Sequence, residues 1–222
     1  MTSYAQKEIE FFGKITAAST HEMKNVLAII KETSGLMEDL MTLSPETPMT
    51  LREKFQNTLS VIASQIKRGA EISDRLNRFA HSTDVPVANI DLYTAAEQIT
   101  ALAQRFARLK QVDLKLDPPA LPMTVAVRPV RLLMTLFGCI ECCLNRLPAG
   151  AHVRVATREK NSGFEISFIC QGDFSCLPDL SQGIATDSRW TDLKQMAASL
   201  GGAIELGAAD PCIRLYLPEP TA

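Results

Sequence analysis

The chain has 222 residues, enough for one large or two small domains, and its 46% hydrophobic and 22% charged residues are ordinary for a globular protein. A formal net charge of −2 and the lack of any run of Lys or Arg argue against a nucleic-acid-binding surface, so we expect no nucleic-acid partner. No apolar run approaches about 18 residues and the N-terminus lacks a signal-peptide core, so we expect a cytoplasmic protein with no membrane partner.

Two long helices open the chain. From about residue 5 to residue 43, apolar side chains recur at three- and four-residue spacing without a proline, which predicts a helix about 60 Å long. Its apolar stripe consists of Phe12, Ile15, Met23, Leu27, Ile30, Met37 and Met41. Residues 44–48 break this helix, and a second one is predicted from about Pro48 to His81. The second stripe consists of Phe55, Leu59, Ile62, Ile66, Ile72, Leu76 and Phe79.

Two antiparallel helices of this length form a hairpin, and a hairpin alone buries only one side of each stripe. Pairing of two copies into a four-helix bundle would cover the remainder. The burial argument therefore predicts a homodimer.

His21 lies apart from the stripe of the first helix. At 100° per residue it stands about 160° to 180° from Met23 and Ile30. The residues within about 40° of it are Lys14, Ala17, Asn25, Ala28 and Glu32. The pattern predicts an exposed imidazole with small and polar neighbours, which a partner can reach.

The pattern changes after a candidate linker at residues 83–89. Helices are predicted at 92–109, 129–147 and 191–200, the last ending at Gly201-Gly202. Strands are predicted at 112–116, 124–127, 152–158, 164–169, 203–206 and 213–217, with a hairpin turn at Asn161-Ser162-Gly163. We therefore predict an α+β fold in which residues 1–84 form a long helical hairpin within a dimeric four-helix bundle and residues 85–222 form an α/β sandwich.

Six cysteines raise the question of a metal site or disulfides. Cys139, Cys142 and Cys143 lie in an apolar helical run, while Cys170, Cys176 and Cys212 are scattered without a second paired spacing. We expect reduced cysteines that pack as small apolar residues, with a zinc site and disulfides as the alternatives. His81 and His152 are expected to be structural.

The sequence His21-Glu22-x-x-Asn25, followed by an apolar helix, resembles the H-box of bacterial two-component histidine kinases. The resemblance implies that His21 is phosphorylated, that Glu22 helps as a base and that Asn25 positions water for phosphatase action. The proline usual near Val26 is missing, which implies a less kinked helix.

The second half resembles the ATP-binding sandwich of the same family in layout, with departures at the nucleotide site. Gly138 and Cys142 stand where the family has asparagines, the second of which is the usual magnesium ligand, and Cys170 replaces the adenine-binding aspartate. Asp187-Ser188-Arg189-Trp190 occupies the place of a Gly-Leu-Gly-Leu motif, and a bulky Arg-Trp pair prevents the close backbone approach that phosphates require. We therefore expect that the chain binds neither ATP nor a metal ion of its own.

An intact histidine motif beside an eroded nucleotide site favours a phosphorelay histidine phosphotransferase. A neutral imidazole nitrogen is a nucleophile for phosphoryl groups, and Glu22 would orient the ring while Lys14 and Lys24 would attract the phosphate. The implied partner is the receiver domain of a response regulator, which would supply the aspartate and its Mg²⁺. Two alternatives are a divergent ATP-dependent histidine kinase and a non-catalytic docking or inhibitory protein that binds a receiver domain.

Overall fold

The computed structural model describes residues 4–43, 48–119, 121–160, 163–172, 180–207 and 211–219. The helices are α1 (Tyr4–Leu43), α2 (Pro48–Ala80), α3 (Leu92–Leu109), α4 (Pro129–Leu144), α5 (Leu180–Ala185) and α6 (Ser188–Ser199), with a 3-10 turn η1 at His81–Thr83. The strands are β1 (Ala88–Asp91), β2 (Asp113–Leu116), β3 (Thr124–Val127), β4 (His152–Lys160), β5 (Gly163–Gln171), β6 (Ala203–Leu206) and β7 (Cys212–Pro218). The predicted α+β class is confirmed.

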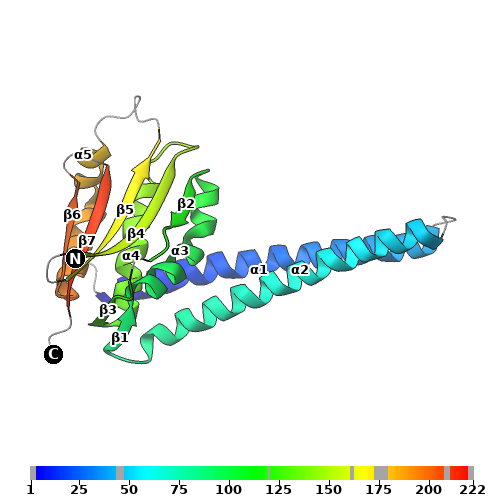
Figure 1. The fold of residues 1–222 in the computed structure, drawn as a ribbon, viewed down its shortest axis with the longest axis horizontal. Helices are drawn as coiled ribbons and strands as arrows, with labels where there is room; N and C mark the ends of the chain where they lie inside the picture. Colours follow the sequence, from blue (N-terminus) through cyan, green and yellow to red (C-terminus); the bar gives the residue numbers. More distant parts are fainter. Residues whose placement is uncertain are drawn as a thin grey trace. The chain divides into compact units, whose positions relative to one another are not determined.

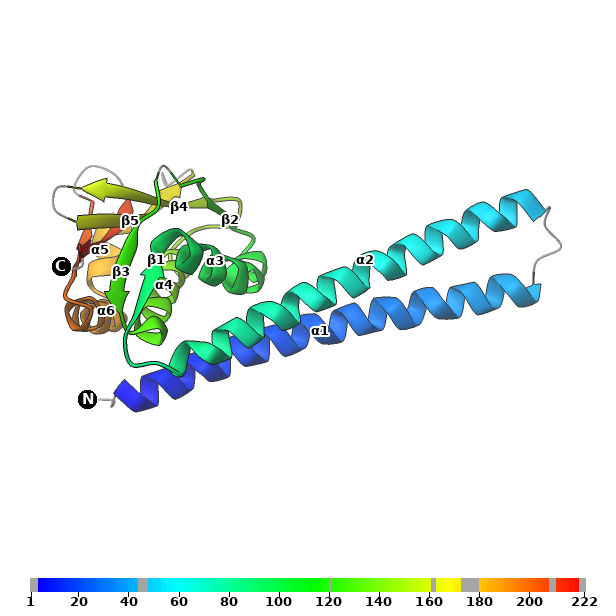
Figure 2. The same ribbon diagram turned by 60° about the horizontal axis from the view of Figure 1, so that its bottom comes forward.

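The helical hairpin is formed by α1 and α2, which run antiparallel side by side (Figures 1 and 2). Close approach of the two helices depends on Gly69 in α2. A Cβ atom added there would lie 3.3 Å from a methyl carbon of Val26 and 3.6 Å from the sulfur of Met23. Even an alanine here would be in tight contact with the Val26 side chain, so there is little room at this crossing for a larger residue.

The predicted apolar stripes are only partly covered within one chain. Leu27 and Met41 on α1 are 58% and 72% exposed, and Leu59 and Ile66 on α2 are 52% and 58% exposed. Val26, which the predicted stripe omits, is 1% exposed. This partial exposure is what we expect of a single hairpin, which buries only the side of each stripe that faces the other helix; the buried side also includes Val26.

The sandwich contains a five-stranded sheet in the order β2-β4-β5-β7-β6 and a two-stranded ribbon, β1-β3. All neighbouring pairs are antiparallel except β2 and β4. Figure 2 shows α3, α4 and α6 on one face of the sheet. Alternate residues of β4, such as Val153 and Val155, point to this face and are fully buried. The other face carries polar residues such as Arg154 and Arg158.

The chain divides into two compact units. Gly13–Ala80 forms one, whereas the start of α1 up to Phe12 belongs with the sandwich, from His81 onward. Lys7 forms an ion pair with Asp192 of α6 at 2.6 Å, and the Phe11 ring lies 5.4 Å from that of Phe137 in α4, centroid to centroid. The first three turns of α1 are thus part of the sandwich's packing.

Most predicted elements are confirmed within a few residues. The structure adds β1 and α5, which the sequence pattern did not indicate, and it begins α6 at Ser188 rather than near residue 191. The earlier start arises because Asp187 caps the helix, its carboxylate accepting the backbone N–H of Arg189. The breaker at residues 44–47 and Asn161-Ser162 of the predicted turn lie outside the described residues.

Candidate functional site

The polar face of α1 presents the histidine motif. His21, Asn25, Lys14 and Lys24 are all exposed, and they lie on one continuous helix with no break at the motif. Glu22 is half-buried, and its Oε1 atom is buried. The sequence thus brings a nucleophilic side chain, an amide and two ammonium groups to the accessible part of one helix.

The backbone beside His21 carries an extra side-chain bond. The hydroxyl of Thr20 donates to the carbonyl oxygen of Thr16 at 2.9 Å and to that of Ala17 at 3.1 Å. The carbonyl of Ala17 is four residues before His21, so it is also the acceptor that the α-helix assigns to the His21 N–H. When a side-chain hydroxyl donates to a carbonyl oxygen that also accepts a helical backbone N–H, the helix can bend or loosen there without a proline.

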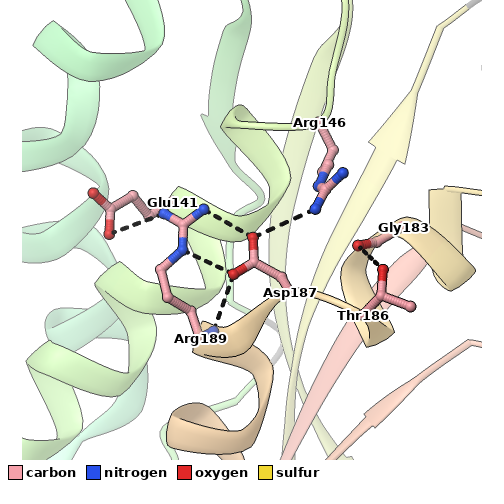
Figure 3. Close-up of polar contacts among 6 residues, drawn as sticks. All are labelled: Glu141, Arg146, Gly183, Thr186, Asp187 and Arg189. Carbon is pink, nitrogen blue, oxygen red and sulfur yellow. Dashed lines mark hydrogen bonds and ion pairs between the residues drawn. The ribbon is translucent and has the colours of Figure 1, made fainter.

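A second polar site joins α4 to the start of α6 in the sandwich (Figure 3). The Asp187 carboxylate is its hub. It accepts hydrogen bonds from Arg189 Nε at 3.1 Å, from Arg189 Nη2 at 2.8 Å and from the Arg189 backbone N–H at 3.0 Å. Arg146 approaches the same carboxylate at 3.6 Å from the other side, and Arg189 Nη1 lies 4.0 Å from Glu141. Two guanidinium groups and two carboxylates therefore form one ionic cluster.

The electrostatics of this cluster follow from its geometry. The hydrogen bonds from Arg189 lower the pKa of Asp187 from 3.8 to about 2. The side chain of Asp187 is only 11% exposed, so its charge is balanced by the two arginines rather than by water. Burial raises the pKa of the neighbouring Cys142 to about 11, which keeps its thiol protonated near neutral pH.

The residues that the sequence resemblance aligns with nucleotide ligands do not fit a magnesium–nucleotide complex. A side chain at Gly138 would place its Cβ 2.6 Å from Leu193, which is 1% exposed and fills that space. Cys142 offers a protonated thiol, whereas Mg²⁺ requires oxygen ligands. The Asp187 carboxylate, which would repel phosphate, is already held by Arg189 and Arg146. The Trp190 side chain is 4% exposed and packs in the core.

The five described cysteines, Cys139, Cys142, Cys143, Cys170 and Cys212, are buried with free thiols, and Cys176 lies outside the described residues. Within the described part of the chain, no three His, Cys, Asp or Glu side chains gather in a way that could hold a metal ion. His81 Nδ1 lies 2.6 Å from Asp84, and His152 Nδ1 lies 3.3 Å from Asp113. Each of these two histidines is thus paired locally with a carboxylate.

Sequence reasoning missed two features of the sandwich. It named Asp187 and Arg189 only as a bulky replacement for glycines, without their ionic link to Arg146. An Asp at the N-cap of a helix followed two residues later by an Arg is the sequence signal for this arrangement. The carboxylate can cap the helix and also accept hydrogen bonds from the guanidinium group. It also did not foresee the packing of Phe11 on Phe137, which no local pattern encodes.

Among the helices of the described residues, none combines the length and the hydropathy needed to cross a bilayer.

No family model and no curated protein sequence matches the chain. Solved structures do. The catalytic domain of histidine kinase ThkA aligns with a TM-score of 0.51 at 12% identity, over 61% of this chain and 97% of that one. The histidine kinase AdeS of Acinetobacter baumannii aligns with a TM-score of 0.47 at 13% identity, over 90% of this chain and 98% of that one. A histidine kinase from Burkholderia phymatum STM815 aligns with a TM-score of 0.48 at 12% identity, over 90% of this chain and 97% of that one. The likeness to ThkA shows that the matched 61% of this chain has the fold of a histidine kinase catalytic domain.

Proposed function

We propose that this protein is a histidine phosphotransferase of two-component signalling, in which His21 carries a phosphoryl group to or from the aspartate of a response-regulator receiver domain. The observation that carries the proposal is a contrast within one chain. An exposed imidazole stands on α1 in a sequence that resembles an H-box, while Leu193 and the Asp187–Arg189 ion pair occupy the positions of the sandwich that the resemblance assigns to a nucleotide.

The transfer step makes few demands on this chain. A neutral ring nitrogen of His21 attacks the phosphorus of an aspartyl phosphate, a nitrogen–phosphorus bond forms, and the bond from phosphorus to the carboxylate oxygen breaks and releases the aspartate. The other ring nitrogen keeps its proton, which the adjacent Glu22 would stabilise. Lys14 and Lys24 would offset the negative charge of the incoming phosphate.

The receiver would supply the remaining chemistry. Phosphoryl transfer depends on in-line positioning and on charge stabilisation. The receiver's own Mg²⁺ would provide the charge stabilisation. We propose that ATP takes no part, because a magnesium–nucleotide complex would have to displace the Asp187 carboxylate from two arginines and move Leu193. Asn25, four residues after His21, would position water if the protein also removes the phosphoryl group.

The active form would be a homodimer. Leu27 and Met41 of α1 and Leu59 and Ile66 of α2 are large apolar side chains left more than half exposed within one chain. Packing against a second hairpin would bury them in a four-helix bundle. His21 lies about 120° from Leu27 around α1, so dimerisation would leave it accessible.

The test uses full-length protein and potassium phosphoramidate, a small phosphoryl donor for histidine. Mass spectrometry should locate a phosphoryl group on His21, and mixing with purified receiver domains should move it to a receiver aspartate. The reverse direction is measured with a receiver first phosphorylated on its aspartate. His21→Gln should abolish both transfers, while the matched control His81→Gln, which changes another exposed histidine, should leave them intact.

The same preparation separates the rival functions. Label that passes from ATP and Mg²⁺ to His21 would identify a divergent kinase and overturn the proposal. A protein that binds a receiver equally well with His21→Ala, and never exchanges phosphate with it, would be a docking or inhibitory protein.

A further inference from the structure

A cavity of about 540 Å³ opens at the end of the sheet where β5 begins. Its walls include Lys160, Phe164, Glu205, Tyr216, Leu217 and Pro218. Backbone of Gly201 and Gly202, which follow α6, completes the rim. Asp187 precedes α6, so this cavity and the ionic cluster lie at opposite ends of that helix. Nothing in the proposed phosphotransfer uses it.

The strand register explains the hollow. Gly163 of β5 pairs with Lys160 of β4 and with Pro218 of β7, and Ala203 of β6 pairs with Tyr216 of β7. Gly163 and Ala203 are small, so little side chain covers the sheet beside the Tyr216 ring. The backbones here are also tightly apposed, because a Cβ on Gly163 would lie 2.4 Å from the Leu217 carbonyl oxygen. The walls of the hollow that the structure describes are therefore formed largely by paired strands.

Lys160 is held in place at the wall of the cavity. Its ammonium donates to the Tyr216 hydroxyl at 2.9 Å and to Glu165 Oε2 at 3.0 Å, and it lies 4.4 Å from the centre of the Tyr216 ring. The Glu165 side chain is fully buried and also accepts from Arg158 Nε at 2.8 Å. Two cations thus share one carboxylate, which leaves a net positive charge beside the cavity.

Lys160 and Tyr216 each keep one hydrogen-bond donor for a ligand, and two such donors beside a positive charge favour an anionic group. An ammonium has three N–H donors, two of which Lys160 uses on Glu165 and Tyr216. The Tyr216 hydroxyl accepts from Lys160 and keeps its own O–H to donate. A carboxylate placed here would receive one bond from each, and these bonds would be charge-assisted and geometrically fixed.

The other side of the cavity carries the opposite charge. Glu205 is an exposed carboxylate on β6, two residues along from Ala203 and on the same face of the sheet. The exposed Pro218 and the ring of Tyr216 supply apolar surface in the same hollow, whereas the buried side chains of Phe164 and Leu217 lie on the other face of the sheet. A complementary molecule therefore has one carboxylate, one ammonium and a short apolar group.

We propose that this cavity binds an α-amino acid with an apolar side chain, with its carboxylate on Lys160 and Tyr216 and its ammonium on Glu205. The inference is independent of the role of His21, since it rests on residues of β4, β5, β6 and β7 alone.

The test is a titration of isotope-labelled full-length protein with L-leucine, read from the backbone amide shifts of Gly201, Gly202 and Ala203. Two further probes each lack one charge: 4-methylpentanoate has no ammonium, and 3-methylbutylamine has no carboxylate. We expect millimolar binding of leucine and at least about 10-fold weaker binding of each single-charge probe, because each loses one ion pair.

Variants assign the two charges. Glu205→Gln should weaken leucine about 10-fold and leave 4-methylpentanoate unchanged, whereas Lys160→Met should weaken both and leave 3-methylbutylamine unchanged. Lys115→Gln, which removes an exposed cation on β2 at the opposite edge of the sheet, should change nothing. If Lys160→Met fails to fold because Glu165 loses a partner, Glu205→Gln with leucine and 4-methylpentanoate still decides. Amides that do not move with leucine at about 10 mM, or that respond equally to all three probes, would overturn the proposal.

Discussion

The Arg189 guanidinium donates two hydrogen bonds to the Asp187 carboxylate at the first turn of α6, from Nε at 3.1 Å and from Nη2 at 2.8 Å. The same carboxylate caps the helix and faces Arg146, which follows α4. A fixed internal anion therefore lies at a helix start where a phosphate group would find its donors.

Replacing Asp187 with Asn should destabilise the protein near neutral pH by up to about 2 kcal/mol, because a pKa lowered from 3.8 to about 2 reports that much preferential binding of the charged form. The wild-type contribution is present above pH 3.8 and is lost as the pH falls towards 2, so the two proteins should converge in acid. Urea unfolding at several pH values measures this difference. Glu141→Gln, at 4.0 Å from Arg189, is the control and should have a smaller effect. A difference that does not depend on pH would contradict this account.

Introducing Asn at Gly138 should lower stability by about 1 to 3 kcal/mol, because the new Cβ would overlap Leu193 in a closed part of the core. Combining the change with Leu193→Ala should recover part of the loss relative to the sum of the single changes, with a coupling of about 0.5 to 3 kcal/mol. Thermal unfolding of the wild type, the two single variants and the double variant measures this coupling in a double-mutant cycle. Strictly additive effects would show that Leu193 does not fill the space of the missing side chain.

Replacing Phe11 with Ala should cost about 3 to 5 kcal/mol, as for other buried phenylalanines, because its ring is 4% exposed and packs on Phe137. Ile9→Ala, two residues earlier on the same helix and 66% exposed, should stay within about 0.5 kcal/mol of wild type. Denaturant unfolding compares the two. Equal effects would mean that the start of α1 does not belong to the packed sandwich.

Placing Glu at Leu27 should convert the proposed dimer to monomers, because a charge would be buried at the interface between hairpins. Leu36 is similarly exposed, at 53% against 58%, but nine residues place it about 180° around α1, so Leu36→Glu should remain dimeric. Sedimentation equilibrium of both variants and the wild type measures whether each protein is a monomer or a dimer. A monomeric wild type would refute the bundle.

Much of this protein can be predicted from its sequence. The 40-residue α1, the 33-residue α2 and the helix Leu92–Leu109 follow from apolar periodicity and from their flanking breakers and caps, which are local properties. The exposure of His21 likewise follows from its angle to Met23 and Ile30 on one helix. The departures of Gly138, Cys142 and Cys170 from the motifs that the chain resembles are visible as residue types alone.

Tertiary structure decided which side of each stripe is buried and which side chains fill the space around Gly138 and Asp187. Val26 is buried and Leu27 exposed, and Gly69 of α2, which is 43 positions from Val26 in the sequence, lies against the Val26 side chain. The fork of Arg189 on Asp187, the closure of Gly138 by Leu193 and the reach of Lys160 across β5 to Tyr216 each depend on elements distant in the chain meeting at van der Waals distance. Periodicity fixes the face of a helix or strand, whereas the partner of that face is set only when the whole core packs.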